Sequence, residues 1–171
     1  MHIYFVTNDK WWSKLHRWGL NEKSTHLGLC FFKDELDIIV DCTKPHGKVY
    51  HADYWFTKYR MVYHLEVECP RSIEHHLLRD AIEMSSMTPY DWGAYFYYIM
   101  MVFRLKLCGK PLPERNMWGG HGRWCTEIID SMFFYFQAKG IRLDWGTYDM
   151  KTPEDLYDEL KQFNDVIEHK V

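Results

Sequence analysis

The sequence predicts an α+β fold, with a small and mainly antiparallel sheet packed by helices. Residues 60–68 alternate apolar and polar side chains, which is typical of a half-buried strand. Residues 25–32 and 36–42 are strand-like and are separated by a short polar turn, so we expect them to pair as a hairpin. A later segment carries apolar side chains at helical spacing, and we expect this face to pack across the sheet. The face consists of Ile128, Ile129, Met132, Phe133 and Phe136.

The N-terminal part of the chain predicts a strand followed by a short helix. Residues 2–7 form the expected strand, and residues 10–18 the expected helix. Asn8 or Asp9 is suited to cap the start of this helix, and Gly19 is expected to end it.

The second half of the chain predicts three more helices besides the one that carries the apolar face. One begins at Pro70 and runs to about residue 87, where a proline breaks it, and a very aromatic helix follows over residues 91–107. Residues 108–124 are rich in glycine and proline and indicate a long loop. Residues 152–155 contain a cap, a proline and an acid that open a last helix. From about Asn164 the chain is expected to be frayed.

Composition indicates one domain over residues 1–171, long enough to build a core. The net charge of −3 does not favour nucleic acid as a partner. Aromatic residues make up 18% of the chain, which indicates a heavily aromatic core. The most apolar run, residues 92–103, is shorter than the roughly 20 residues that a transmembrane helix needs, so no transmembrane segment is expected.

The cysteines and the first residues of the sequence indicate the cellular compartment in which the protein is expected. Five cysteines, an odd number without any Cys-x-x-Cys pair, indicate free thiols in a reducing environment. The first residues lack the features of a secretory signal, so we expect a cytoplasmic protein, or one that reaches its target after lysis or as part of a larger particle.

Cys125 is the first candidate functional residue. It follows the glycine-rich run at residues 119–122 and precedes the helical apolar pattern, so it is expected at a helix N-terminus. Free backbone amides and the helix dipole favour an anion at that position, and the same amides can hold a developing oxyanion. The position suits a nucleophile, which needs a histidine as its base.

His26 is the strongest of ten candidates for that base. It lies inside an apolar strand, where a lone histidine is most often a core residue held by one hydrogen bond. The next strand, however, ends in Asp41, between Val40 and Cys42, an unusual place for a carboxylate without a partner. If the two strands pair, Asp41 lies opposite the His26 end and orients the imidazole.

The order of these elements resembles the permuted papain-like amidases, the circularly permuted branch of the NlpC-type cysteine peptidase superfamily. The resemblance rests on residues 25–29 (THLGL), the acid that closes residues 39–41 (IVD), and residues 124–129 (WCTEII), with Pro89-Tyr90-Asp91 and residues 152–157 as weaker matches. In ordinary papain-like enzymes the cysteine precedes the histidine, whereas in this branch the histidine strand comes first.

The resemblance implies a cysteine hydrolase that cleaves amide or ester bonds, such as peptidoglycan peptides or acylated amines, through a thioester and without a metal or other cofactor. Cys125 matches the nucleophile, His26 the base, and Asp41 the orienting residue. We also expect three residues to line the site or support the oxyanion, namely Tyr90, Trp124 and His121.

Other hypotheses stay open. The same scaffold supports acyl transfer, because an amine or alcohol can replace water in attacking the thioester, and it also supports a catalytically idle interaction protein. His75 and His76, with nearby acids, are more typical of a solvated helix face than of a metal site. A zinc site at His121 and Cys125 is a weaker hypothesis, because glycines would interrupt any helix that holds both residues.

Overall fold

A computed structural model describes residues 1–171 except 44–45, 88, 114, 116, 119–124 and 142–150. Within these residues the strands form one antiparallel sheet in the order β4-β3-β2-β1-β5-β6. Helices pack against this sheet, so the α+β prediction is confirmed. The strands are β1 (His2–Thr7), β2 (His26–Phe31), β3 (Ile38–Asp41), β4 (Lys48–His51), β5 (Arg60–Val67) and β6 (Val166–His169).

The main core lies on one face of the sheet. Side chains from β1, β2, β3 and β5 meet α3 (Arg71–Met87), the 3₁₀ helix η1 (Cys125–Met132), α5 (Phe133–Ala138) and α6 (Pro153–Leu160). The expected packing of the apolar segment across the sheet is confirmed for Ile128, Ile129, Met132 and Phe136, which are all buried there. The segment begins as a 3₁₀ helix rather than an α-helix, and the α-helix starts only at Phe133.

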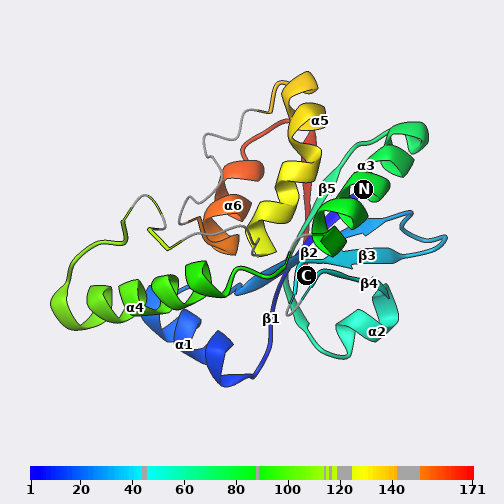
Figure 1. Ribbon diagram of the computed structural model, residues 1–171. Coiled ribbons are helices and arrows are strands. Elements are labelled where there is room, and N and C mark those ends of the chain that lie inside the picture. The colour runs from blue at the N-terminus through cyan, green and yellow to red at the C-terminus, as the bar shows by residue number, and fades with distance from the viewer. Residues whose placement is uncertain (44–45, 88, 114, 116, 119–124, 142–150) are drawn as a thin grey trace.

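The opposite face of the sheet is covered by α2 (Ala52–Phe56), which lies on the other side from α3, α5 and α6 (Figure 1). Trp55 of α2 is fully buried against Tyr4, Val6 and Ile39. Successive side chains of a strand point to opposite faces, so His26 and Gly28 of β2 point to the α2 face while Leu27 and Leu29 enter the main core.

The helices α1 (Trp11–Leu20) and α4 (Trp92–Cys108) pack together beside the sheet (Figure 1). Gly19 does not end α1 as expected. A β-carbon at Gly19 would lie 2.0 Å from Cγ1 of Val102, so this glycine allows the close approach of the two helices. The helix ends at Asn21, whose φ of 62° is left-handed and whose amide donates to the Arg17 carbonyl.

Two expectations about the C-terminal region have different outcomes. The last helix is confirmed as α6: Thr152 accepts from the Asp155 amide, and the Asp155 carboxylate accepts from the Thr152 amide. The expectation of a frayed end is wrong, because β6 pairs with β5 from Val67↔Val166 to His64↔His169.

In the described residues, none of the helices has the length and hydrophobicity that crossing a membrane requires.

Candidate active site

His26, which is partly buried, and Asp41, which is fully buried, form a pair on the α2 face of the sheet. Nε2 of His26 lies 2.5 Å from Oδ1 of Asp41, and the carboxylate is shielded from solvent. The two strands pair with Leu29 opposite Val40, and this register continued by one residue puts Asp41 beside Gly28. Asp41 therefore reaches His26 diagonally on the same face, rather than from the directly opposite position.

A tryptophan from α2 satisfies the second oxygen of Asp41. The indole Nε1 of Trp55 donates to Oδ2 at 2.7 Å, and Trp55 itself is fully buried. A β-carbon at Gly28 would lie 2.8 Å from Cζ2 of Trp55 and 3.0 Å from Cγ2 of Ile39. The glycine two residues after His26 thus leaves room for the indole that holds the carboxylate.

Substituting Gly28 is expected to disturb Asp41 indirectly, through the indole of Trp55. Gly28→Ala should push the indole away from Asp41 and cost about 1–3 kcal/mol of stability. Trp55→Phe is the matched variant, because it keeps an aromatic ring and removes only the donor to Asp41. Urea unfolding measures both, and wild-type stability of Gly28→Ala would show that the close packing has no energetic role.

The His26 ring is held from a second side by Tyr59. The two rings stack with centroids 5.1 Å apart, and Tyr59 also packs against Trp55 at 4.8 Å. Burial by itself lowers the pKa of His26. The negative charge of Asp41 raises this pKa, smaller electrostatic and hydrogen-bonding influences of Tyr59, Asp41 and Cys125 act in the same direction, and together they outweigh the effect of burial. The net result is a pKa of His26 well above its ordinary value of 6.5.

This raised pKa has a defined effect on stability. The protonated ring stabilises the folded state fully below the unfolded pKa of about 6.5, and that contribution is lost as the pH rises through the higher folded pKa. We therefore expect the difference in unfolding free energy between wild type and His26→Gln to shrink from acidic to alkaline pH. Urea unfolding of both proteins across a pH series tests this, and a difference that grows with pH would contradict it.

Cys125 and His26 line the same cavity. Cys125 is the first residue of η1, and an interaction between its thiol and the His26 ring is among the influences that raise the pKa of that ring. Because Nε2 of His26 faces Asp41, Nδ1 is the ring nitrogen left for the thiol. Asp41, His26 and Cys125, which the sequence analysis grouped as acid, base and nucleophile, therefore lie close to one another.

A cavity of about 240 Å³ opens over His26 and Cys125. Its wall combines aromatic rings with polar groups from α1, α4 and the start of α6, so it can hold a ligand that has both apolar and polar parts. Besides His26 and Cys125, the lining includes Ser13, His16, Trp12, Tyr59, Tyr90, Tyr95, Tyr98, Lys151 and Thr152.

No protein-family model and no curated protein matches this sequence. The functional interpretation of the site therefore rests on its geometry.

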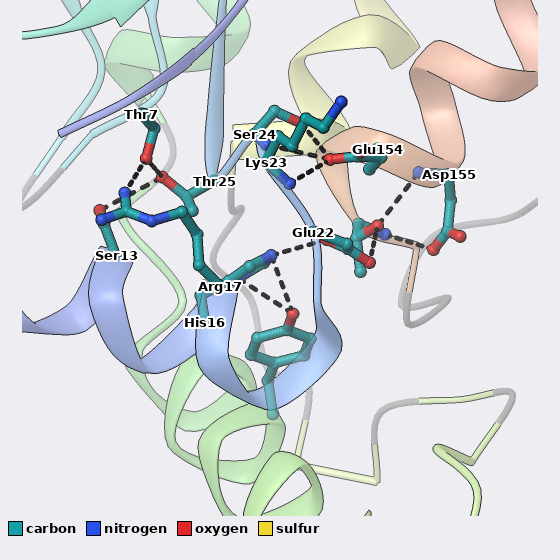
Figure 2. A network of polar contacts seen from close by, with 12 residues as sticks. Thr7, Ser13, His16, Arg17, Glu22, Lys23, Ser24, Thr25, Glu154 and Asp155 are labelled. Carbon is teal, nitrogen blue, oxygen red and sulfur yellow. Dashed lines mark hydrogen bonds and ion pairs between the residues drawn. The ribbon is translucent and has the colours of Figure 1, made fainter. Parts of the chain in front are cut away.

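A polar network fixes the wall of the cavity around α1 (Figure 2). Glu22 joins two elements, because its Oε2 lies 2.8 Å from Nε2 of His16 and its Oε1 accepts from Thr152 at 2.9 Å. Glu154 accepts from the amides of Lys23 at 2.6 Å and Ser24 at 3.0 Å. These contacts bind the segment before β2 to α6, and so they fix the position of the chain that leads into His26.

Thr25 continues this network directly before His26. Its hydroxyl lies 3.2 Å from that of Thr7 and donates to Ser13 at 3.2 Å (Figure 2). Its amide donates to the Val6 carbonyl at 2.8 Å. The side chain of Arg17 also donates to Thr7 and to the Asn8 carbonyl. Thr25, the residue directly before β2, is thus anchored to both β1 and α1.

Tyr90 was expected to line the site, and it does border the cavity with Cys125. Burial raises the pKa of Tyr90 well above its ordinary value, with the charge of Cys125 as the next cause, so Tyr90 keeps its proton and can act as a donor. The other two expected residues, Trp124 and His121, lie outside the described residues.

The sequence analysis did not identify Trp55, Tyr59, Tyr95 or His16 as parts of the site. The first two follow β4 in the chain, and the last two come from helices α4 and α1. For Trp55, Tyr59 and Tyr95 the sequence signal was the high aromatic content, which is equally typical of a core.

Proposed function

We propose that this protein is a cysteine-dependent hydrolase of amide or ester bonds that works through a thioester acyl-enzyme. The observation that carries the proposal is the chain of contacts from Asp41 through His26 to Cys125 beneath a cavity. A nucleophile, a base and a group that orients the base are the parts that such chemistry requires. We further propose a circularly permuted papain-like architecture, supported by a histidine strand that precedes the cysteine helix and by the packing of that helix across an antiparallel sheet.

In the first half of the proposed reaction, Cys125 attacks the substrate carbonyl. The raised pKa of His26 favours transfer of the thiol proton to the imidazole, so the proposed nucleophile is a thiolate paired with the imidazolium. The sulfur forms a bond to the carbonyl carbon, and the negative charge moves to the carbonyl oxygen. When that tetrahedral intermediate collapses, His26 gives its proton to the leaving amine or alcohol, and a thioester remains on Cys125.

In the second half, water releases the acyl group. The neutral imidazole of His26 takes a proton from the water, whose oxygen attacks the thioester carbonyl. The bond to sulfur then breaks, the acid leaves, and the thiolate–imidazolium pair returns. Asp41 accepts from the ring throughout, so it fixes the tautomer and stabilises the charged imidazole, while the Tyr90 hydroxyl supplies a donor for the oxyanion.

The cavity suggests the kind of substrate. Trp12, Tyr90 and Tyr95 offer ring faces for an apolar acyl chain, a sugar or a peptide side chain, and Ser13 and Lys151 offer polar contacts near the same space. Peptidoglycan peptides and acylated amines both combine these features. The substrate panel therefore needs both classes.

Thiol labelling tests the nucleophile before any substrate is known. At mildly acidic pH, iodoacetamide is expected to modify Cys125 before exposed Cys108, because Cys125 interacts with the His26 imidazole, whose raised pKa favours the positively charged ring. Burial raises the pKa of both Cys30 and Cys42 to about 12, so these thiols should stay unmodified. Peptide mapping by mass spectrometry gives the rates.

The matched control for the labelling is His26→Ala. In that variant the advantage of Cys125 over Cys108 at acidic pH should disappear. Faster labelling of Cys108 in the wild-type protein, or an unchanged Cys125 rate in His26→Ala, would contradict the ion pair.

A substrate panel tests the reaction itself. Wild-type protein and Cys125→Ala are incubated with peptidoglycan fragments and, separately, with N-acyl and thioester compounds, with and without an added amine acceptor. Acid release that needs Cys125 supports hydrolysis, and formation of an acyl–amine product assigns acyl transfer instead. No turnover on either class, together with an unreactive Cys125, would leave the interaction-protein hypothesis.

A further inference from the structure

Three histidines from three neighbouring strands converge on one face of the sheet. His64 of β5 lies directly opposite His169 of β6, and His2 of β1 pairs with Glu66, two residues farther along β5. Paired residues project to the same face, which here is the face that α2 covers in part. Nδ1 of His2 lies 2.9 Å from Nε2 of His64, and one nitrogen from each of the three rings lies within 4.8 Å of the other two.

Aromatic side chains pack against the histidine rings. The buried ring of Tyr4 lies 4.7 Å from that of His64 and stacks beside His2, and Phe56 packs edge-on against Tyr4. The outer side is open, since the His169 side chain is 40% exposed. The imidazoles are thus packed against aromatic rings and remain partly exposed to solvent, where an ion can reach them.

We propose that His2, His64 and His169 form a binding site for a divalent transition metal of the zinc class. Three imidazole nitrogens suit zinc, copper or nickel, whereas calcium and magnesium require oxygen ligands. Tetrahedral zinc at about 2.0–2.1 Å from nitrogen sets its ligand atoms about 3.4 Å apart. One separation in the cluster is 2.9 Å and all lie within 4.8 Å, so the nitrogens are already near the spacing that a tetrahedral ion requires.

Glu66 supplies the negative charge that a bound cation needs nearby. Its Oε2 lies 2.7 Å from Nε2 of His169, the relation in which a carboxylate holds a metal-binding histidine. The neighbouring cation Lys33 is itself engaged, because its Nζ lies 2.5 Å from Asp34 and 3.8 Å from Asp37.

The site is structural rather than catalytic. None of the three histidines lines the cavity over Cys125. A metal bound there joins β1, β5 and the edge strand β6, and so connects residues far apart in the sequence. Because the unfolded chain lacks the assembled site, metal binding stabilises the folded protein.

Calorimetric titration of Zn²⁺ into metal-free protein tests the proposal, with a protein that carries no histidine tag. Cys125→Ala serves as the background, because a thiol beside an imidazole also binds zinc, and this choice makes the result independent of the proposed hydrolase activity. We expect one equivalent to bind with a Kd at or below about the micromolar range. At a hundredfold excess over Kd, the melting temperature should rise by about 5–10 °C.

Two variants and one control complete the test. His64→Ala and His169→Ala should each weaken zinc binding by about 10- to 100-fold or more and so reduce the thermal shift to about half or less at the same zinc concentration. His169 is the safer position, because it lies on the edge strand, whereas His64 packs on Tyr4. His76→Ala, at an exposed histidine of α3, should bind zinc like the background protein. No stoichiometric binding, or full binding by His169→Ala and His64→Ala, would overturn the proposal.

Discussion

Cys125→Ala is expected to lower turnover by at least about 10⁴-fold on any substrate that the panel identifies, because the acceptor of the acyl group is removed. His26→Ala is expected to cause a loss of similar size, since the thiol then has no imidazole to take and return its proton. The two residues act as one unit, so the double variant should be no slower than either single variant.

The controls for this prediction address folding. Cys125 is half-buried at the start of η1, and its substitution removes a single sulfur atom, so the free energy of unfolding should change by no more than about 1 kcal/mol. Steady-state kinetics and urea unfolding on the same preparations separate the two effects. Full activity in Cys125→Ala would exclude this residue as the nucleophile. Additive losses in the double variant would mean that the two side chains do not act together.

Asp41 is expected to affect both stability and activity, and two substitutions separate these effects. In Asp41→Ala the buried N–H of Trp55 and the His26 ring lose their acceptor, which should cost about 3–5 kcal/mol. Asp41→Asn keeps one oxygen that can accept from Trp55, so it should retain more of the stability. Its amide nitrogen, however, can only donate toward Nε2 of His26, which favours the wrong tautomer.

We therefore expect Asp41→Asn to remain folded and to lose about 10²- to 10⁴-fold in turnover, which is less complete than the loss in Cys125→Ala. The pKa of His26, followed by NMR titration of the ring protons, should fall in this variant because the charge of Asp41 is the main influence that raises it. Equal stability of the Ala and Asn variants would show that Trp55 needs no acceptor. An unchanged pKa of His26 in Asp41→Asn would contradict the electrostatic role of the carboxylate.

The sequence alone was sufficient for the features that depend on local pattern. Alternation predicted β5, apolar runs around a polar turn predicted β2 and β3, and the capping residues at Thr152 predicted α6. The same local signals singled out His26 and Asp41, because each is a polar residue in an apolar strand. Cys125 was found because a glycine-rich run precedes a helical pattern.

Only the tertiary structure decided which distant side chains meet. Trp55 reaches Asp41 because α2 folds over the β2–β3 pair and Gly28 leaves room for the indole, a packing relation with no local pattern. The C-terminal residues looked frayed because a four-residue edge strand gains its stability from the ladder with β5 rather than from its own composition. His2, His64 and His169 gave no metal-ligand spacing in the sequence, because strand pairing across β1, β5 and β6 brings them together.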